Sequence, residues 1–194
     1  RDSESFQLGI AILARGTNNL QGAVVLTEVG LTSEANSLVR AALECCFALG
    51  ALRSGFPLFD KLQNAHNRAR RTWGRFQLDN RGVSALDKEQ LDRIEKQMAE
   101  TPKGERLLFE DLARRAGLTE YYETMYRPLS NFGTHLSEGS LSLLLEPSEN
   151  DAEHIIMAMH GVVSTFGVFL REIDRLFPVP SLATHVESTI SAFA

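Results

Sequence analysis

The sequence predicts an all-α fold, a single domain over residues 1–194 built as one bundle of five to seven helices. Apolar residues recur at helical spacing over long stretches, and no run alternates between apolar and polar residues as a half-buried strand would. Only six prolines interrupt the chain, which leaves room for long helices. With 43% hydrophobic and 23% charged residues, the composition is that of a globular protein with a sizeable core.

The first helix is expected over residues 3–29, with Ser3 as its cap. Gly30 is expected to end it, and a second helix over residues 34–53 is the most apolar of the chain. Three glycines weaken the prediction of the first helix, because a glycine inside a helix costs roughly 1 kcal/mol relative to alanine: Gly9, Gly16 and Gly22.

A polar stripe runs along the second helix. Asn36, Arg40 and Glu44 are spaced four residues apart and therefore share one face. Two interpretations are open. The stripe is either solvent-exposed with a weak ion pair, or it is a buried polar stripe that faces a site, as the apolar residues around it suggest.

The third helix is expected over residues 57–76 and carries the one strongly basic cluster of the sequence. Arginines together with an aromatic side chain can hold a phosphate backbone and stack on bases. The other interpretation is a solvated basic face. The candidate nucleic-acid-binding residues are Arg68, Arg71, Arg75 and Trp73.

Residues 84–104 are expected to form a peripheral insertion, in which Ser84 caps a charged helix. The core is expected to rest on the second helix and on the two last long helices, where apolar residues dominate. The remaining helices are predicted over residues 85–100, 105–116, 128–145 and 151–176.

The segment 121–145 gathers the most reactive side chains of the chain. In a helix starting near Pro128, Arg127, Asn131 and His135 fall on one face, and Ser130 lies about a turn away. A histidine that moves a proton and an arginine that stabilises a developing phosphate charge can cleave a phosphodiester without a metal. The alternative is that His135 is a core histidine, bonded to a backbone carbonyl or to Tyr126.

Other classes of protein fit the sequence less well. The sequence holds no Glu-x-x-His pair, no zinc-ligand spacing and no glycine-rich phosphate loop, so neither a metal nor a cofactor is expected. The net charge of −5 restricts any nucleic-acid binding to a local patch. Cys45 and Cys46 are expected to be packing residues in a reducing, cytoplasmic setting, and no apolar run reaches the ~20 residues of a membrane helix.

Two spaced motifs, Arg40-x-x-x-Glu44 and Tyr126-x-x-x-Ser130-x-x-x-x-His135, carry a family resemblance. The chain resembles a widespread bacterial family of unknown function, whose all-helical members carry an Arg-x-x-x-Glu helix and a Tyr-x-x-x-Ser-x-x-x-x-His helix. That family is similar to the HEPN superfamily of helical bundles, many of which are dimeric, metal-independent ribonucleases of toxin and anti-phage systems.

The histidine motif departs from the HEPN pattern. HEPN nucleases begin this motif with an arginine, whereas Ser130 stands at that position here and Arg127 lies one helical turn earlier. Either Arg127 or Arg40 supplies the positive charge, or this branch has lost the chemistry.

The resemblance implies a metal-independent ribonuclease or a nucleotide-processing effector of a bacterial defence or toxin system, acting as a homodimer in the cytoplasm on RNA or a nucleotide, with no membrane. The alternative is a non-catalytic, dimeric binding or regulatory bundle whose polar cluster is structural or holds a small ligand. Five side chains are expected to converge: Arg40, Glu44, Tyr126, Ser130 and His135. The candidate catalytic residues are these five with Arg127 and Asn131.

Overall fold

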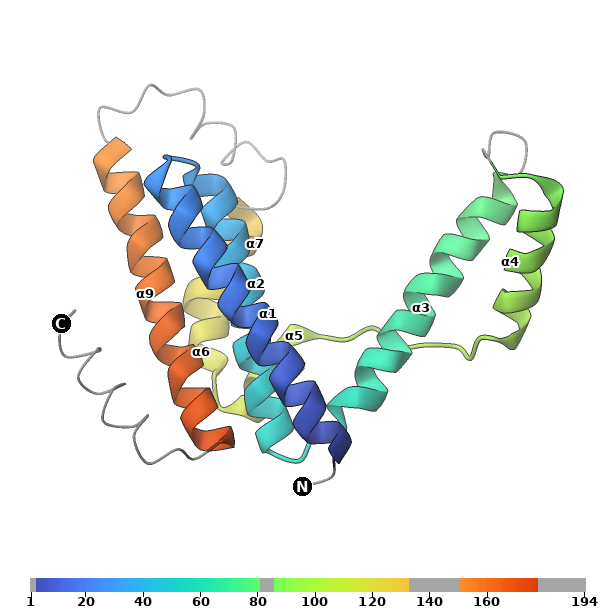
Figure 1. Cartoon of the computed structure of the whole chain (residues 1–194), viewed down its shortest axis with the longest axis horizontal. Coiled ribbons are helices and arrows are strands. Elements are labelled where there is room, and N and C mark those ends of the chain that lie inside the picture. Colours follow the sequence, from blue (N-terminus) through green and yellow to red (C-terminus); the bar gives the residue numbers. More distant parts are fainter. Residues whose placement is uncertain (1–2, 81–85, 133–150, 178–194) are drawn as a thin grey trace. The chain divides into compact units, whose positions relative to one another are not determined.

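The computed structural model of the chain describes residues 3–80, 86–132 and 151–177 (Figure 1). Every regular element in these residues is a helix, and they contain no strand, as the sequence predicts. The chain divides into two compact units. One comprises Arg1–Phe56 and Phe109–Ala194, and the other comprises Pro57–Leu108. The second unit is larger than the peripheral insertion expected at residues 84–104, because it includes the long third helix as well.

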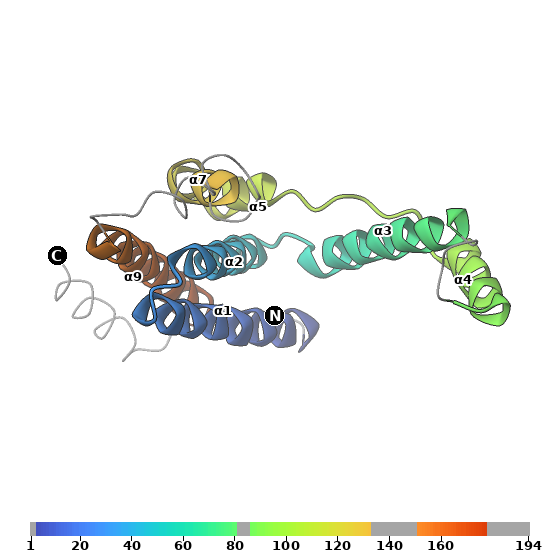
Figure 2. The ribbon, with the colours of Figure 1, turned by 90° about the horizontal axis from the view of Figure 1, so that it is seen from above.

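The first unit is built around α2 (Thr32–Arg53), which packs against α1 (Ser3–Glu28), α9 (Asp151–Leu176) and α5 (Phe109–Ala116). The helices α1, α2 and α9 lie side by side in both ribbon views (Figures 1 and 2). The sequence predicted α2, α9 and a helix over residues 128–145 as the core helices. Most of the last one lies outside the described residues, and the described core also includes α1 and α5. Its largest fully buried side chains include Leu43, Phe47, Leu49, Leu112 and Phe169.

The glycines of α1 are contact points in this core. A Cβ atom at Gly16 would lie 2.4 Å from the ring of Phe169 in α9, and one at Gly22 would lie 2.8 Å from Leu38 in α2. The loss of helix propensity at these glycines is therefore offset by close packing between helices, since apolar contact area replaces the missing side chains. This is why α1 remains one continuous helix.

Residues 119–132 form a continuous helical segment with a wide turn in its middle. It consists of α6 (Thr119–Tyr121), the π-helical turn η1 (Tyr122–Tyr126) and α7 (Arg127–Phe132). The backbone N–H of Arg127 donates to the carbonyl of Tyr122, five residues back, as π geometry requires. The sequence predicts a kink or restart at Pro128, and the wide turn directly before this proline is where the regular hydrogen-bond pattern changes.

The second unit is a pair of helices, α3 (Leu58–Asp79) and α4 (Lys88–Glu100). Asp87 and Gln90 form a capping box at the start of α4, while the predicted cap Ser84 lies outside the described residues. The two helices meet closely at Gly74, where a Cβ atom would lie 2.5 Å from the sulfur of Met98. Residues 102–108 are extended, so the helix predicted over residues 105–116 begins later, at Phe109.

Two described helices, Thr32–Arg53 and His154–Leu176, are long and apolar enough to cross a membrane by length and composition alone. The most apolar window of the first is 61% buried among other helices, as in the core helix of a soluble protein, and that of the second is 28% buried. The sequence-based expectation of no membrane segment and a cytoplasmic location therefore stays a prediction.

Candidate functional site

Three of the side chains expected to converge meet in the first unit. One guanidinium nitrogen of Arg40, Nη2, donates to the hydroxyl oxygen of Tyr126 at 3.2 Å and lies 3.2 Å from Oε1 of Glu44. The Tyr126 hydroxyl in turn donates to the same Glu44 oxygen at 3.0 Å. Arg40 and Glu44 come from α2 and Tyr126 from the end of η1, so the triangle joins segments that are 82 residues apart between Glu44 and Tyr126. We call these three residues the Arg–Glu–Tyr cluster.

Aromatic rings fix the position of Tyr126 within the cluster. Its ring stacks on Tyr122 with 5.1 Å between centroids, and Phe47 and Phe109 approach it at 5.7 and 6.0 Å. The Arg40 guanidinium also lies 5.2 Å from the centre of the Tyr126 ring. Tyr126 is buried, and the side chains of Arg40 and Glu44 remain about a quarter exposed. The cluster therefore has a packed aromatic side and a side that is open to solvent.

Burial raises the pKa of the Glu44 carboxyl above its usual 4.5, although the Tyr126 hydrogen bond and the charges of Arg40 and Arg15 act in the opposite direction. Burial also raises the pKa of the Tyr126 hydroxyl above its usual 10. A carboxyl whose pKa moves toward neutrality is a better general base at physiological pH. Arg40 and Glu44 of the polar stripe are thus partly buried and contact Tyr126, and that the stripe faces a site stays a prediction.

The other predicted site residues have different positions. The Ser130 hydroxyl donates to the backbone carbonyl of Tyr126 at 2.8 Å. Arg127 is exposed, pairs with Glu123 at 2.6 Å and lies 5.9 Å from the centre of the Tyr122 ring. The side chain of Asn131 and the whole of His135 lie outside the described residues. The hydrogen bond to Glu123 raises the pKa of Arg127, which stays fully charged.

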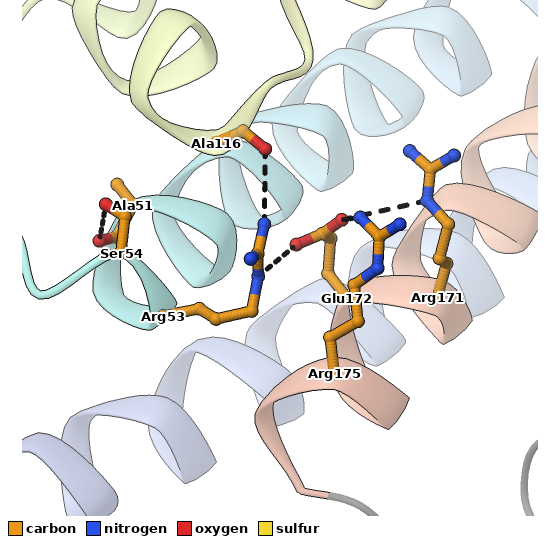
Figure 3. Close-up of polar contacts among 7 residues, drawn as sticks. All are labelled: Ala51, Arg53, Ser54, Ala116, Arg171, Glu172 and Arg175. Carbon is orange, nitrogen blue, oxygen red and sulfur yellow. Dashed lines mark hydrogen bonds and ion pairs between the residues drawn. The ribbon is translucent and has the colours of Figure 1, made fainter.

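A second polar cluster, which the sequence analysis missed, surrounds Glu172 in α9 (Figure 3). Its carboxylate is fully buried and accepts from Arg53 at 3.3 Å and from Arg175 at 3.2 Å, with Arg171 3.7 Å away. Arg53 also donates to the carbonyl of Ala116 at the end of α5. A buried carboxylate is tolerated only when it is paired in this way, so Glu172 ties α9 to α2 and α5.

The predicted nucleic-acid-binding residues lie in the second unit, where the structure separates them into two sets. Arg68, Arg71 and Arg75 line one groove of about 490 Å³, together with Thr72, Phe76, Asp79, Lys103 and Gly104. Trp73 lines another groove, between α3 and α4, with Arg70 and Met98. Within the first groove Arg71 is already engaged, because it donates to the carbonyls of Met98 and Thr101, both at 2.7 Å.

The described residues contain no group of three or more histidine, cysteine, aspartate or glutamate side chains that could hold a metal ion. Both cysteines are buried and unbridged, and burial raises the pKa of Cys45 to about 11. A thiol with such a pKa carries almost no nucleophilic thiolate at neutral pH. Cys45 and Cys46 therefore act in packing, as the sequence predicts.

The chain matches no curated protein and no solved structure. A family model does match, over residues 7–154, a range that covers most of the chain and includes every residue of the Arg–Glu–Tyr cluster. The family carries no assigned activity, in agreement with the sequence-based resemblance to a family of unknown function. The chain belongs to DUF5677, a family of unknown function.

Proposed function

We propose that the chain is a metal-independent ribonuclease with a HEPN-like helical bundle, and that the Arg–Glu–Tyr cluster together with His135 forms its active site. The observation that carries this proposal is a carboxylate that is about a quarter exposed and has a raised pKa, held 3.0 Å from a tyrosine hydroxyl and 3.2 Å from a guanidinium. The carboxylate supplies a base and the guanidinium supplies donors for a phosphoryl oxygen, both of which RNA cleavage without metal requires.

In the proposed reaction, Glu44 removes the proton from a ribose 2′-hydroxyl through Oε2, because Oε1 is occupied by Arg40 and Tyr126. The 2′-oxygen forms a bond to the adjacent phosphorus while the bond from phosphorus to the 5′-oxygen breaks. Arg40 stabilises the charge that develops on the phosphoryl oxygens, while the Tyr126 hydroxyl holds Glu44 in place through its hydrogen bond. His135 gives a proton to the leaving 5′-oxygen. The products are a 2′,3′-cyclic phosphate and a free 5′-hydroxyl.

The assignment of Arg40 rather than Arg127 follows from their surroundings. Arg40 is about a quarter exposed and touches the other members of the cluster, whereas Arg127 is exposed and paired with Glu123. We therefore assign to Arg40 the role of the arginine that begins the histidine motif in HEPN nucleases. A cytoplasmic role in defence or toxin systems, with two copies forming a homodimer, belongs to the same proposal and is supported by the resemblance.

A second candidate function rests on the closed arrangement of the cluster. Arg40, Glu44 and Tyr126 bond to one another, and the Tyr126 ring stacks on Tyr122, as in a structural network, although Nε of Arg40 has no partner within the described residues. In this alternative the protein is a non-catalytic binding or regulatory bundle. Its cluster then contributes to stability or holds a small ligand.

Cleavage of single-stranded RNA in EDTA separates the two candidates. We expect the wild type to remain active after chelation, and Glu44→Gln, Arg40→Gln and His135→Ala each to lower the rate by roughly 10²- to 10⁴-fold. Arg127→Gln, which removes an exposed and separately paired arginine, is the matched control and should leave the rate unchanged.

Thermal unfolding of the same variants completes the test. A catalytic histidine facing a cleft is dispensable for folding, whereas loss of a structural one costs about 1–3 kcal/mol through its orphaned partner. A wild type that cleaves no RNA with or without EDTA, combined with a sharply lowered Tm of His135→Ala, would rule out the nuclease and leave the binding bundle.

A further inference from the structure

The groove of the second unit has an excess of positive charge. Four cationic side chains line it, and Asp79 is its single acidic residue. In the part of the chain that the structure describes, Arg68, Arg75 and Lys103 form no ion pair, although exposed arginines elsewhere do so, such as Arg93 with Glu89 and Arg114 with Glu110. Three cations without partners around one hollow favour an anionic ligand.

The shape of the groove comes from a close contact between α3 and the extended segment 102–108. A Cβ atom at Gly104 would lie 1.9 Å from the carbonyl oxygen of Asn64 and 2.5 Å from the backbone nitrogen of Arg68. Only glycine lets the segment lie directly on the helix, and Lys103 beside it lines the groove together with the arginines of α3. The positive charges are thus contributed by two different segments.

The spacing of the arginines suits a strand with repeated charges. Arg68 and Arg75 are seven residues apart on one helix, which corresponds to about 10 Å along its axis. At this spacing they can contact different phosphates of one strand. Arg71, held between them by two backbone carbonyls, adds a fixed positive charge.

An exposed aromatic ring completes the surface. Phe76 lines the same groove and is 61% exposed, a large apolar area to leave in water. It follows Arg68 by eight residues and Arg75 by one, so it lies on the rim of the charged groove. An aromatic ring beside arginines is a platform for an unpaired base, and bases are available for stacking only in single strands.

We propose that this groove binds single-stranded RNA, with Arg68, Arg75 and Lys103 on the phosphates and a base stacked on Phe76. The inference rests on the proposed function for its choice of RNA, and it names the substrate of that function as a single strand. It also explains how a chain with a net charge of −5 can engage a polyanion, since the positive charge is concentrated in one unit.

Binding can be measured separately from cleavage with a fluorescein-labelled, 2′-O-methylated single-stranded RNA, because methylation removes the attacking hydroxyl. Fluorescence anisotropy of the full chain should show roughly tenfold weaker binding for Arg68→Gln/Arg75→Gln. The slope of log K against log salt concentration should fall by about 1.4, at about 0.7 per lost phosphate contact.

A second variant separates stacking from charge. Phe76→Leu should weaken binding about tenfold while leaving the salt dependence unchanged, because no phosphate contact is lost. The matched control is Arg70→Gln/Arg93→Gln, which removes the same amount of charge from the same unit, one arginine from α3 and one from α4, without changing a residue that lines the groove. Circular dichroism verifies that all three variants are folded.

The outcomes distinguish this inference from the nuclease. Equal losses in the Arg68/Arg75 and Arg70/Arg93 variants, or binding unaffected by Phe76→Leu, would overturn the single-strand groove. Competition by polyglutamate as effective as that by RNA would overturn it too, in favour of an acidic protein partner. A wild type that binds the methylated RNA but cleaves no unmodified RNA would rule out the nuclease activity and still support RNA binding by the groove. An RNA cleavage rate that is unchanged by Arg68→Gln/Arg75→Gln would support the nuclease activity and rule out the groove as its RNA-binding surface.

Discussion

Two glutamates with opposite surroundings illustrate the chemistry of single residues here. Glu172 is fully buried and surrounded by arginines, with Arg53 and Arg175 as its direct partners, so its charge is matched and it serves to join helices. Glu44 is about a quarter exposed and shares one oxygen between Arg40 and Tyr126. Burial outweighs these partners and raises its pKa. Of these two carboxylates, Glu44 is therefore the better candidate for a general base.

The raised pKa of Glu44 predicts a specific pH dependence of stability. Well below the ordinary pKa of 4.5 the carboxyl is protonated in both the folded and the unfolded chain. As the pH rises, the unfolded chain releases this proton first while the folded chain retains it, so the free energy of unfolding falls through this range. Relative to Glu44→Gln, which cannot titrate, the wild type should lose stability between about pH 4 and the folded pKa.

Urea denaturation of the two proteins at several pH values measures this difference. Chemical denaturation gives the free energy of unfolding at each pH, and subtracting the Glu44→Gln curve removes the contributions of the other titrating groups. A difference that increases with pH would show that the pairing with Arg40 and Tyr126 dominates over burial, and the assignment of Glu44 as a base would lose its support.

At the scale of the element, the glycines of the helices have opposite roles depending on what faces them. Gly16 of α1 lies against Phe169, and an added Cβ would be 2.4 Å from that ring. Gly161 of α9 has its nearest neighbour, a methyl group of Val39, at 3.8 Å, which is an ordinary contact. The first glycine is required by packing, and the second leaves room for a methyl group.

Gly16→Ala should destabilise the protein by about 1–3 kcal/mol, because overpacking of the core exceeds the gain in helix propensity. Gly161→Ala should stabilise it by about 0.5–1 kcal/mol, since only the propensity changes. The midpoints of urea denaturation measure both effects with the same substitution. Stabilisation by Gly16→Ala would mean that α1 does not pack on α9 at this point.

The π-helical turn is the other element with a clear consequence. Tyr122 and Tyr126 begin and end it, and their rings stack with 5.1 Å between centroids. The wide turn holds the Tyr126 hydroxyl at Glu44, and π-turns of this kind are frequent at functional sites. Its position is consistent with a role for the Arg–Glu–Tyr cluster beyond simple packing.

At the scale of the whole molecule, the described surface of the first unit has exposed apolar side chains on its two long outer helices. Val25 of α1, Val29 in the turn directly after it, and Ile156 and Met157 of α9 are each more than half exposed. We expect the chain to form a two-fold homodimer, because identical apolar patches are most simply covered by each other in a closed pair.

Light scattering at micromolar concentration should therefore give twice the chain mass of 21.5 kDa. Met157→Glu should shift the protein toward the monomer, since a charge in an apolar interface is costly. Phe59→Glu, at an exposed apolar residue of the second unit, should leave the mass unchanged. A wild-type mass equal to that of one chain would contradict the dimer.

The sequence by itself determined the elements that depend on local patterns. The helix predicted over residues 151–176 has the observed bounds of α9, and the first helix differs by one residue, because helical hydrogen bonds join residues four apart and leave a period that can be read directly. The spacing of Arg40 and Glu44, with the motif at Tyr126, also identified the residues that meet in the cluster.

Only the tertiary structure decided which of these local features packs on which. Gly16 and Gly104 look like helix breakers or loop residues until Phe169 and the backbone of α3 are placed against them. In the sequence, Glu172 is one of several charged residues near a helix end, and this local pattern does not distinguish it. Its role depends on the hydrogen bond from Arg53, which is 119 residues away. Such contacts depend on which surfaces meet, and periodicity carries no information about a distant partner.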